Sequence, residues 1–224
     1  MPPWIGDTVL VTNGMYASGG RALAAYPLMT NRVCVDRAIT LRSVNGPDQT
    51  VIQGYKLASY GYGEGAIRAL YLTNGAFITG FTLTNGATRA SGDTTYDQSG
   101  AGILAASTNA VVSNCIVIRN ASRIGGGGTS GGTINNCSIT RNSSQQSGGG
   151  AYMGTLNNCT VTLNYAKETG GGVAHCTANN SLVTTNLCTG DGGGAYVSTL
   201  CNSILIANRC DMMGWGGLGP ITPS

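Results

Sequence analysis

The 224-residue chain carries 12 basic and 9 acidic residues, so charged side chains make up only 9% of it and the formal net charge is +3. The basic residues are scattered along the sequence, a pattern that does not favour nucleic-acid binding. Apolar residues make up 42% of the chain, which excludes a disordered polypeptide, and no apolar run approaches the roughly 20 residues that span a membrane.

The first 99 residues predict irregular coils of β-structure separated by long loops. Alternating apolar residues between Gly6 and Gly14, and again at 33–52 and 69–83, are typical of strands that end at turn pairs such as Asn-Gly. Three excursions interrupt this pattern and are expected as loops, at residues 14–31, 55–65 and 87–99. No segment before Ile5 is long enough to cap the first strand, so open strand edges predict end-to-end self-association as one alternative.

From residue 100 onwards, three columns of residues recur in a single register of 22 residues, which indicates a solenoid repeat. The first column is an asparagine followed by Cys or Ser, at Asn114, Asn136, Asn158, Asn180 and Asn202. The second is a further asparagine, at Asn120, Asn142, Asn164, Asn186 and Asn208. The third is a glycine cluster, at 126–128, 148–150, 170–172 and 192–194.

Each repeat predicts short strands. Segments 159–163 and 181–185 alternate in polarity and contain β-branched residues, whereas a glycine triplet would cost about 1 kcal/mol per residue in a helix. A coil of 22 residues has room for three short strands, each paired in parallel with its copy about 4.8 Å away in the next coil. The sequence therefore predicts an all-β fold, a right-handed parallel β-helix of about eight or nine coils. Its single domain comprises irregular coils at 1–99, regular coils at 100–213 and a tail at 214–224.

The register also predicts which side chains face inward. Two aliphatic columns are expected in the core, namely Val117, Ile139, Val161, Val183 and Leu205 in one strand and Ile134, Leu156, Ala178 and Leu200 in another. Cys115, Cys137 and Cys159 precede the first column by two residues and are expected as buried thiols. The column from Asn120 to Asn208 lies at a bend, where stacked amides bond from coil to coil, so these asparagines are predicted to be structural.

The remaining cysteines leave two alternatives open. Cys188 and Cys210 are one coil apart, and their Cα atoms at about 5 Å would permit a disulfide, although two free thiols fit the sequence equally well. No Cys-x-x-Cys or Cys/His metal spacing occurs, so neither a metal site nor a cofactor is expected.

Two groups of motifs resemble known families. Gly-Gly-Ala-Tyr at 149–152 and 193–196, with an aliphatic residue three before an asparagine, resembles the repeats of polymorphic outer membrane proteins, whose Phe is replaced here by Val, Ile or Leu. Gly-Asp-Thr-Val-Leu-Val and Val-Ile-Gln-Gly in the N-terminal half are similar to bacterial β-helix proteins of the pectate-lyase-like superfamily. These resemblances cover nearly the whole chain. They imply an extracellular or cell-surface protein, with adhesin-like passengers and polysaccharide-active enzymes among its relatives.

The excursions hold the side chains that could form a specialised site. The candidates for catalysis are Asp93, Asp97, Glu64 and Arg89, because two carboxylates about 5 to 10 Å apart would suit glycoside chemistry, although solvated loop charge is the alternative. The candidates for ligand binding are Tyr55, Tyr60, Tyr62 and Tyr96, whose flat rings fit sugars. His175, the only histidine, shares its register position with Met153 and Val197 and is expected to be buried or packed on the wall.

Three functional hypotheses follow. The first is a secreted or cell-surface β-helix that binds carbohydrate or another surface ligand, in the manner of an adhesin and without catalysis. The second is a polysaccharide lyase or glycoside hydrolase that uses the same loops. The third is a structural module that self-associates through its ends.

Overall fold

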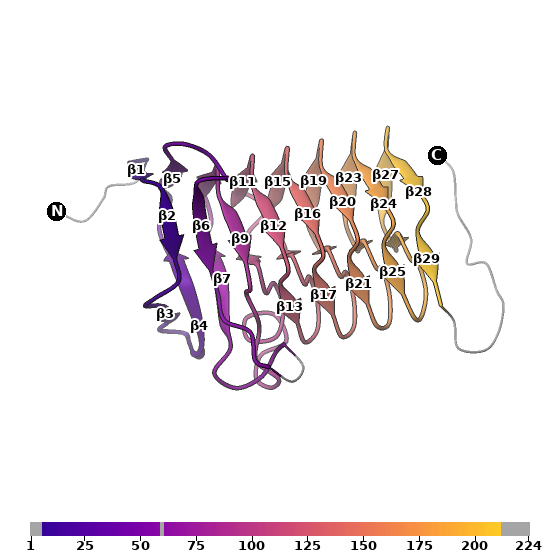
Figure 1. The fold of residues 1–224 in the computed structure, drawn as a ribbon, viewed down its shortest axis with the longest axis horizontal. Helices are drawn as coiled ribbons and strands as arrows, with labels where there is room; N and C mark the ends of the chain where they lie inside the picture. Colours follow the sequence, from indigo (N-terminus) through magenta and orange to yellow (C-terminus); the bar gives the residue numbers. More distant parts are fainter. Residues whose placement is uncertain (1–5, 59–60, 212–224) are drawn as a thin grey trace.

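The computed structural model describes residues 6–58 and 61–211. Every regular element in these residues is a β-strand, and the strands stack coil upon coil along one axis (Figure 1). The predicted all-β parallel β-helix is therefore confirmed. None of the described segments forms a helix with the length and apolar character required to cross a bilayer. The candidate Tyr60 and the predicted tail at 214–224 lie outside the described residues.

Three sheets of eight strands run along the molecule, and the first two contribute one strand per coil, so the described residues form eight coils, within the predicted eight or nine. The first sheet contains β1 (Thr8–Val11), β5 (Thr40–Ser43), β8 (Phe77–Thr79), β11 (Val111–Ser113), β15 (Thr133–Asn135), β19 (Thr155–Asn157), β23 (Thr177–Asn179) and β27 (Thr199–Cys201). The second contains β2 (Gly14–Tyr16), β6 (Thr50–Gln53), β9 (Thr82–Thr84), β12 (Ile116–Ile118), β16 (Ser138–Thr140), β20 (Thr160–Thr162), β24 (Leu182–Thr184) and β28 (Ile204–Ile206). The third contains β3 (Arg21–Leu23), β4 (Tyr26–Val35), β7 (Ile67–Leu72), β10 (Ile103–Ala105), β14 (Thr129–Ser130), β18 (Ala151–Tyr152), β22 (Val173–Ala174) and β26 (Ala195–Tyr196).

The regular coils contain a fourth strand position, where the sequence predicted only three. This fourth sheet consists of two-residue strands, β13 (Ala121–Ser122), β17 (Ser143–Ser144), β21 (Tyr165–Ala166), β25 (Leu187–Cys188) and β29 (Arg209–Cys210). The residue before each asparagine of the second column, such as Arg119 with φ 58° or Leu163 with φ 57°, takes the left-handed conformation. This sharp corner redirects the chain, so that the two residues after the asparagine pair with their copies in a new plane.

The first excursion is mostly strand, so the prediction of a loop at residues 14–31 is wrong. β2 joins the second sheet, and β3 pairs antiparallel with β4 as a hairpin at the edge of the third sheet. The ten residues of β4 pair with β7 along their C-terminal part, which anchors the hairpin to the solenoid. The missed strands have no copy at the 22-residue register, and this removed the periodic signal that identified the others.

The core lies where the register places it. Val117, Ile139, Val161 and Val183 have no exposed surface, and Cys115, Cys137 and Cys159 are at most 3% exposed. Leu205 continues the same column but is 43% exposed, because it lies on β28, the last strand of the second sheet. The inward faces therefore form one continuous column of apolar side chains that ends at the last coil.

The second asparagine column forms a hydrogen-bonded ladder inside the solenoid. Asn164 shows the pattern, since its Oδ1 accepts hydrogen bonds from the backbone N–H of Asn142 at 2.9 Å and from its Nδ2 at 3.0 Å. Its own Nδ2 donates to Oδ1 of Asn186 at 3.0 Å and to the Ile139 carbonyl at 2.9 Å. The same contacts join Asn120 through to Asn208, and the members from Asn120 to Asn186 are at most 1% exposed.

Candidate functional site

Segments from all three excursions meet on one side of the molecule (Figure 1). We name residues 21–31, 55–58, 61–65 and 87–99 the loop cluster. The N–H of Gly63 donates to the Thr88 carbonyl at 2.8 Å, and Nη1 of Arg89 donates to the Leu28 carbonyl at 3.3 Å. Ala87 forms a parallel bridge with Ala121 of the fourth sheet, so the loop cluster continues the side that the fourth sheet forms in later coils.

A buried arginine on β7 holds the third excursion in place. Arg68 is 1% exposed, and its Nε donates to the Gly100 carbonyl at 2.8 Å. Nη2 donates to the carbonyls of Tyr96 and Ser99 at 2.5 and 2.9 Å, and Nη1 donates to Oδ1 of Asn31 at 2.8 Å. Burial lowers the pKa of Arg68 to about 10, an effect that the charge of Asp97 partly opposes. Two of these four hydrogen bonds therefore hold the third excursion itself, and the other two reach Gly100 at its end and Asn31 on β4.

The two candidate aspartates are engaged within their own loop. Oδ1 of Asp93 accepts hydrogen bonds from the N–H groups of Thr95 at 2.9 Å and Tyr96 at 2.8 Å, which closes a turn. Asp97 is 4% exposed, and its Oδ2 accepts a hydrogen bond from the Asp93 N–H at 2.9 Å. Its Oδ1 is buried with no partner among the described residues. The pair therefore shapes the loop, and only Asp93 is exposed to solvent.

The other two catalytic candidates pair with each other across two excursions. Arg89 forms an ion pair with Glu64, whose Oε1 also accepts a hydrogen bond from the Ser91 hydroxyl at 3.0 Å. Nε of Arg89 is buried and has no partner among the described residues. The structure thus brings Glu64 and Arg89 together in a contact that joins the second and third excursions.

The tyrosines of the loop cluster have different surroundings. Tyr96 stacks on Tyr26, with ring centroids 3.6 Å apart and planes inclined by 6°. Tyr62 lies 5.9 Å from the guanidinium of Arg123, within the range of a cation–π contact, and Tyr55 is 52% exposed. Desolvation, with the neighbouring Tyr96 and Asp93, raises the pKa of Tyr26 above its ordinary value.

Sequence reasoning missed both Tyr26 and Arg68. Tyr26 lies in the first excursion, which was expected to be a loop. Arg68 interrupts the apolar run of β7, Ile67-Arg-Ala-Leu-Tyr-Leu72, and a charge inside a continuous apolar strand was the available signal.

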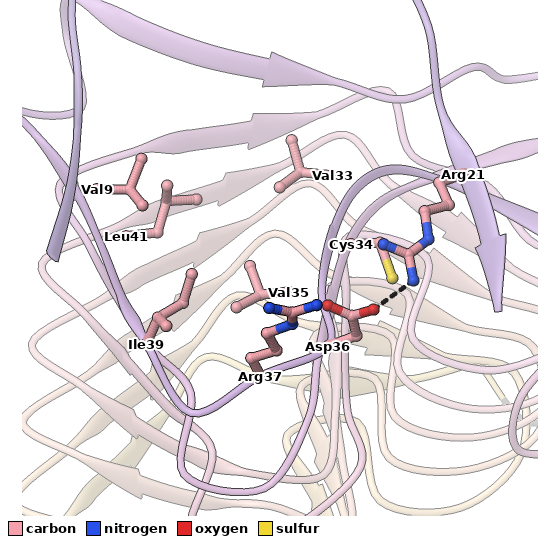
Figure 2. Close-up of a pocket in the computed structure, with 9 residues that line it drawn as sticks. All are labelled: Val9, Arg21, Val33, Cys34, Val35, Asp36, Arg37, Ile39 and Leu41. Atoms are coloured by element: carbon pink, nitrogen blue, oxygen red, sulfur yellow. Dashed lines mark hydrogen bonds and ion pairs between the residues drawn. The ribbon is translucent and has the colours of Figure 1, made fainter. Parts of the chain in front are cut away.

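A separate cavity of about 350 Å³ lies at the N-terminal end (Figure 2). Its walls are mainly the aliphatic side chains Val9, Val33, Val35, Ile39 and Leu41. Arg21 and Asp36 form an ion pair in its lining, beside Cys34 (Figure 2). Burial raises the pKa of the Cys34 thiol, which disfavours the reactive thiolate. These walls continue the inward faces of the first coils, so the cavity is the end of the hydrophobic core.

The remaining candidates are single groups outside the loop cluster. The Sγ atoms of Cys188 and Cys210 are 3.1 Å apart but not bonded, so their disulfide stays a prediction. Of the two alternatives expected for His175, burial is wrong, because its column occupies an exposed left-handed turn between the third and first sheets (φ 54°). Its imidazole instead packs on the wall, against the rings of Tyr152 and Tyr196. Within the described ranges, no three His, Cys, Asp or Glu side chains gather to hold a metal ion.

No protein-family model matches this chain, and neither a curated protein nor a solved structure matches it. We therefore infer the function of the chain from its fold and from the geometry of the loop cluster.

Proposed function

We propose that this chain is a secreted or cell-surface β-helix that binds carbohydrate through the loop cluster, in the manner of an adhesin and without catalysis. The observation that carries the proposal is the burial of Arg68 beneath the third excursion. Removing a guanidinium from water costs several kcal/mol unless its donors are satisfied, and all four bonds made here end on the excursion or its neighbours. Such an arrangement favours a loop held in one conformation before any ligand arrives.

A loop fixed in advance suits the recognition of sugars. Ordering loops and side chains during binding reduces affinity, so a rigid platform binds more tightly than a mobile one with the same contacts. Tyrosine adds a flat apolar face together with a hydroxyl group, which matches the apolar faces and hydroxyl rims of a sugar ring. The Tyr26–Tyr96 pair and the exposed Tyr55 supply these groups within the loop cluster.

The engagement of the carboxylates favours binding over turnover. A glycosidase needs one carboxyl group as acid and a second as nucleophile or base, both directed at the substrate. Here Glu64 is paired with Arg89, Asp93 caps a turn and Asp97 is buried. The proposed location outside the cell or on its surface comes from the resemblance to polymorphic outer membrane protein repeats and to pectate-lyase-like β-helix proteins.

The proposal is tested on an array of uronate and neutral glycans, with the purified chain probed for binding and, separately, for released sugar products. Binding is expected without product release. Tyr96→Ala is expected to weaken it about tenfold by removing the stacked pair. Tyr165→Ala in the regular coils serves as the matched control and leaves binding unchanged. Product release that disappears in Asp93→Ala would replace this proposal with the lyase or hydrolase alternative.

End-to-end self-association is a second candidate, favoured by the apolar side chains at the two ends. Leu10 and Met15 are 63% and 65% exposed in the first coil, and Ile204 and Ile206 are 61% and 58% exposed on β28. Among the described residues β2 and β28 are edge strands, and edge strands with exposed apolar residues promote association between chains. Light scattering across a dilution series would then show mass that increases with concentration, whereas a constant monomer mass contradicts this candidate.

A further inference from the structure

Exposed aromatic and apolar side chains form a row outside the third sheet, in the regular coils. Tyr152 and Tyr196 occupy equivalent positions on β18 and β26, with Ala174 of β22 between them in register. The residues that follow, Met153, His175 and Val197, occupy the adjoining turn. Met153 and Val197 are 58% and 66% exposed, His175 is exposed, and both tyrosines are half-buried. We name Tyr152, Met153, His175, Tyr196 and Val197 the aromatic stripe.

The two tyrosines of the stripe rest on small residues. A methyl group at Gly125 would lie 2.5 Å from Cδ1 of Tyr152, so this ring leans onto the backbone of the preceding coil. The residue one coil before each tyrosine is small and covered, Ser130 at 4% exposure and Ala174 at 0%. Rings that lie across such positions bury one face and leave the other available to a ligand.

His175 connects the two rings. Its imidazole meets Tyr152 edge-on, with centroids 5.6 Å apart and planes inclined by 89°, and meets Tyr196 at 5.8 Å and 84°. Such perpendicular contacts are a favoured aromatic geometry and fix the rings relative to one another. The tyrosines are two coils apart, which corresponds to about 9.6 Å along the axis.

A column of polar residues accompanies the stripe. Gly125, Ser147, Thr169 and Asp191 are linked by successive parallel bridges, and the Tyr152 ring lies on the first of them. The hydroxyl groups of Ser147 and Thr169 are 2.8 Å apart and half-buried, and Asp191 is exposed. In a sugar-binding site, an aromatic ring stacks on the apolar face of the sugar, and neighbouring hydroxyl and carboxylate oxygens form hydrogen bonds with the sugar hydroxyl groups.

We propose that the aromatic stripe is a second binding site, for an extended β-1,4-linked glycan lying along the solenoid axis. Adjacent sugars in a β-1,4-linked chain are flipped relative to each other, so the same sugar face recurs once per disaccharide. The length of this disaccharide repeat is close to the spacing of the two tyrosines. Glycans with β-1,3 or α-1,4 linkages curve and do not present faces at this interval. The site shares no residue with the loop cluster, so it stands or falls independently of the proposed function.

The test uses cellohexaose as the probe, with laminarihexaose and maltohexaose as linkage controls, in calorimetric titrations of the whole chain. Cellohexaose is expected to bind and the other two to bind at least tenfold more weakly. Tyr152→Leu and Tyr196→Leu are each expected to weaken cellohexaose binding about tenfold, whereas the Phe variants at the same positions retain it because the flat ring remains.

Two further variants separate this site from its neighbours. Tyr165→Ala on β21 is expected to leave cellohexaose binding unchanged, and titration of Tyr96→Ala shows whether the loop cluster takes up the same probe. Equal binding of all three glycans, no binding of cellohexaose, or equal affinities for the Leu and Phe variants would overturn the proposal. Loss of binding in Tyr96→Ala alone would place the cellohexaose site in the loop cluster and also overturn it.

Discussion

The fourth sheet and the loop cluster form the same side of the solenoid in different coils, and different hydrogen-bonding groups stabilise the two regions. In the regular coils, two-residue strands follow a ladder of neutral amides, in which each asparagine satisfies the next. In the irregular coils the ladder ends, since the N–H of Gly86 makes the last bond to Oδ1 of Asn120 at 2.7 Å. Beyond that point, one buried cation, Arg68, holds the chain.

The difference shows how a repeat protein can acquire a specialised region. A repeated amide is donor and acceptor at once, so identical coils satisfy one another and every coil has the same shape. A guanidinium only donates, so its partners must be carbonyls or acids supplied by a segment with its own conformation. Replacing the ladder by Arg68 therefore allows a unique loop, at the cost of burying a charge.

The largest expected effect comes from breaking the ladder at its centre. Asn164→Ala leaves the buried backbone N–H of Asn142 without its partner. It also removes one of the two hydrogen bonds of Asn142 Nδ2, which keeps the Val117 carbonyl, and one of the two of Asn186 Oδ1, which keeps the backbone N–H of residue 164. One unsatisfied buried group costs about 1–3 kcal/mol and each further lost hydrogen bond about 1 kcal/mol, so we expect a loss of about 3–5 kcal/mol, measured by urea unfolding followed by circular dichroism. Asn208→Ala, at the half-buried end of the ladder, is the matched control and should cost about 1–2 kcal/mol. Equal midpoints for the two variants would contradict a cooperative ladder.

Removing the buried cation should have a slightly smaller effect that is confined to the irregular coils. Arg68→Met keeps roughly the length of the side chain but removes the donors to three backbone carbonyls and to the amide oxygen of Asn31. It also removes the positive charge that lies near Asp97. We expect a loss of about 3 kcal/mol in urea unfolding. Arg42→Met, at an exposed position on β5, should change the midpoint by less than about 0.5 kcal/mol. A stable Arg68→Met variant would mean that the buried charge does not hold the loops.

Joining Cys188 to Cys210 should strengthen the last regular coil. Oxidised glutathione is expected to form a mixed disulfide with the exposed Cys210 and to release one glutathione thiol. The Cys188 sulfur then attacks Sγ of Cys210, which breaks the mixed disulfide and releases the second glutathione as a thiol. The product lacks two hydrogen atoms by mass spectrometry, and closing a loop of this length stabilises by about 3 kcal/mol. Cys188→Ser is the control. A product that retains glutathione would show that the two thiols do not form a bond.

The smallest effect concerns thiol reactivity and leaves the fold unchanged. Burial raises the pKa of Cys176 to about 11 and, with the neighbouring Cys210, that of Cys188 to about 12. A raised pKa lowers the thiolate fraction at a given pH, so both should resist iodoacetamide at pH 8, while the exposed Cys201 is labelled. Peptide mapping measures this, and the urea-unfolded chain should label at all positions. Equal labelling of Cys188 and Cys201 in the folded chain would contradict the assigned burial.

The regular half could be predicted from sequence because each position is constrained by its copies. The columns through Val117 and Ile134 were identified by period alone, and the structure buries both. The fourth sheet was missed because its two-residue strands carry unlike residues, such as Ala121, Ser143 and Tyr165, and show no polarity pattern. At the loop cluster, Tyr26 and Arg68 contact residues that are distant in the sequence. Neither secondary-structure propensity nor the repeat period predicts such contacts.

Hydrogen exchange of wild type and Arg68→Met, followed by mass spectrometry, tests most directly whether one buried cation holds the loop cluster. In wild type, the N–H groups of Arg89, Asp97 and Gln98 are bonded within the third excursion and should exchange slowly. In Arg68→Met, exchange at 87–99 should accelerate while exchange at 143–188, along the amide ladder, stays the same. Unchanged exchange at 87–99 in the variant would show that Arg68 does not hold the third excursion in place.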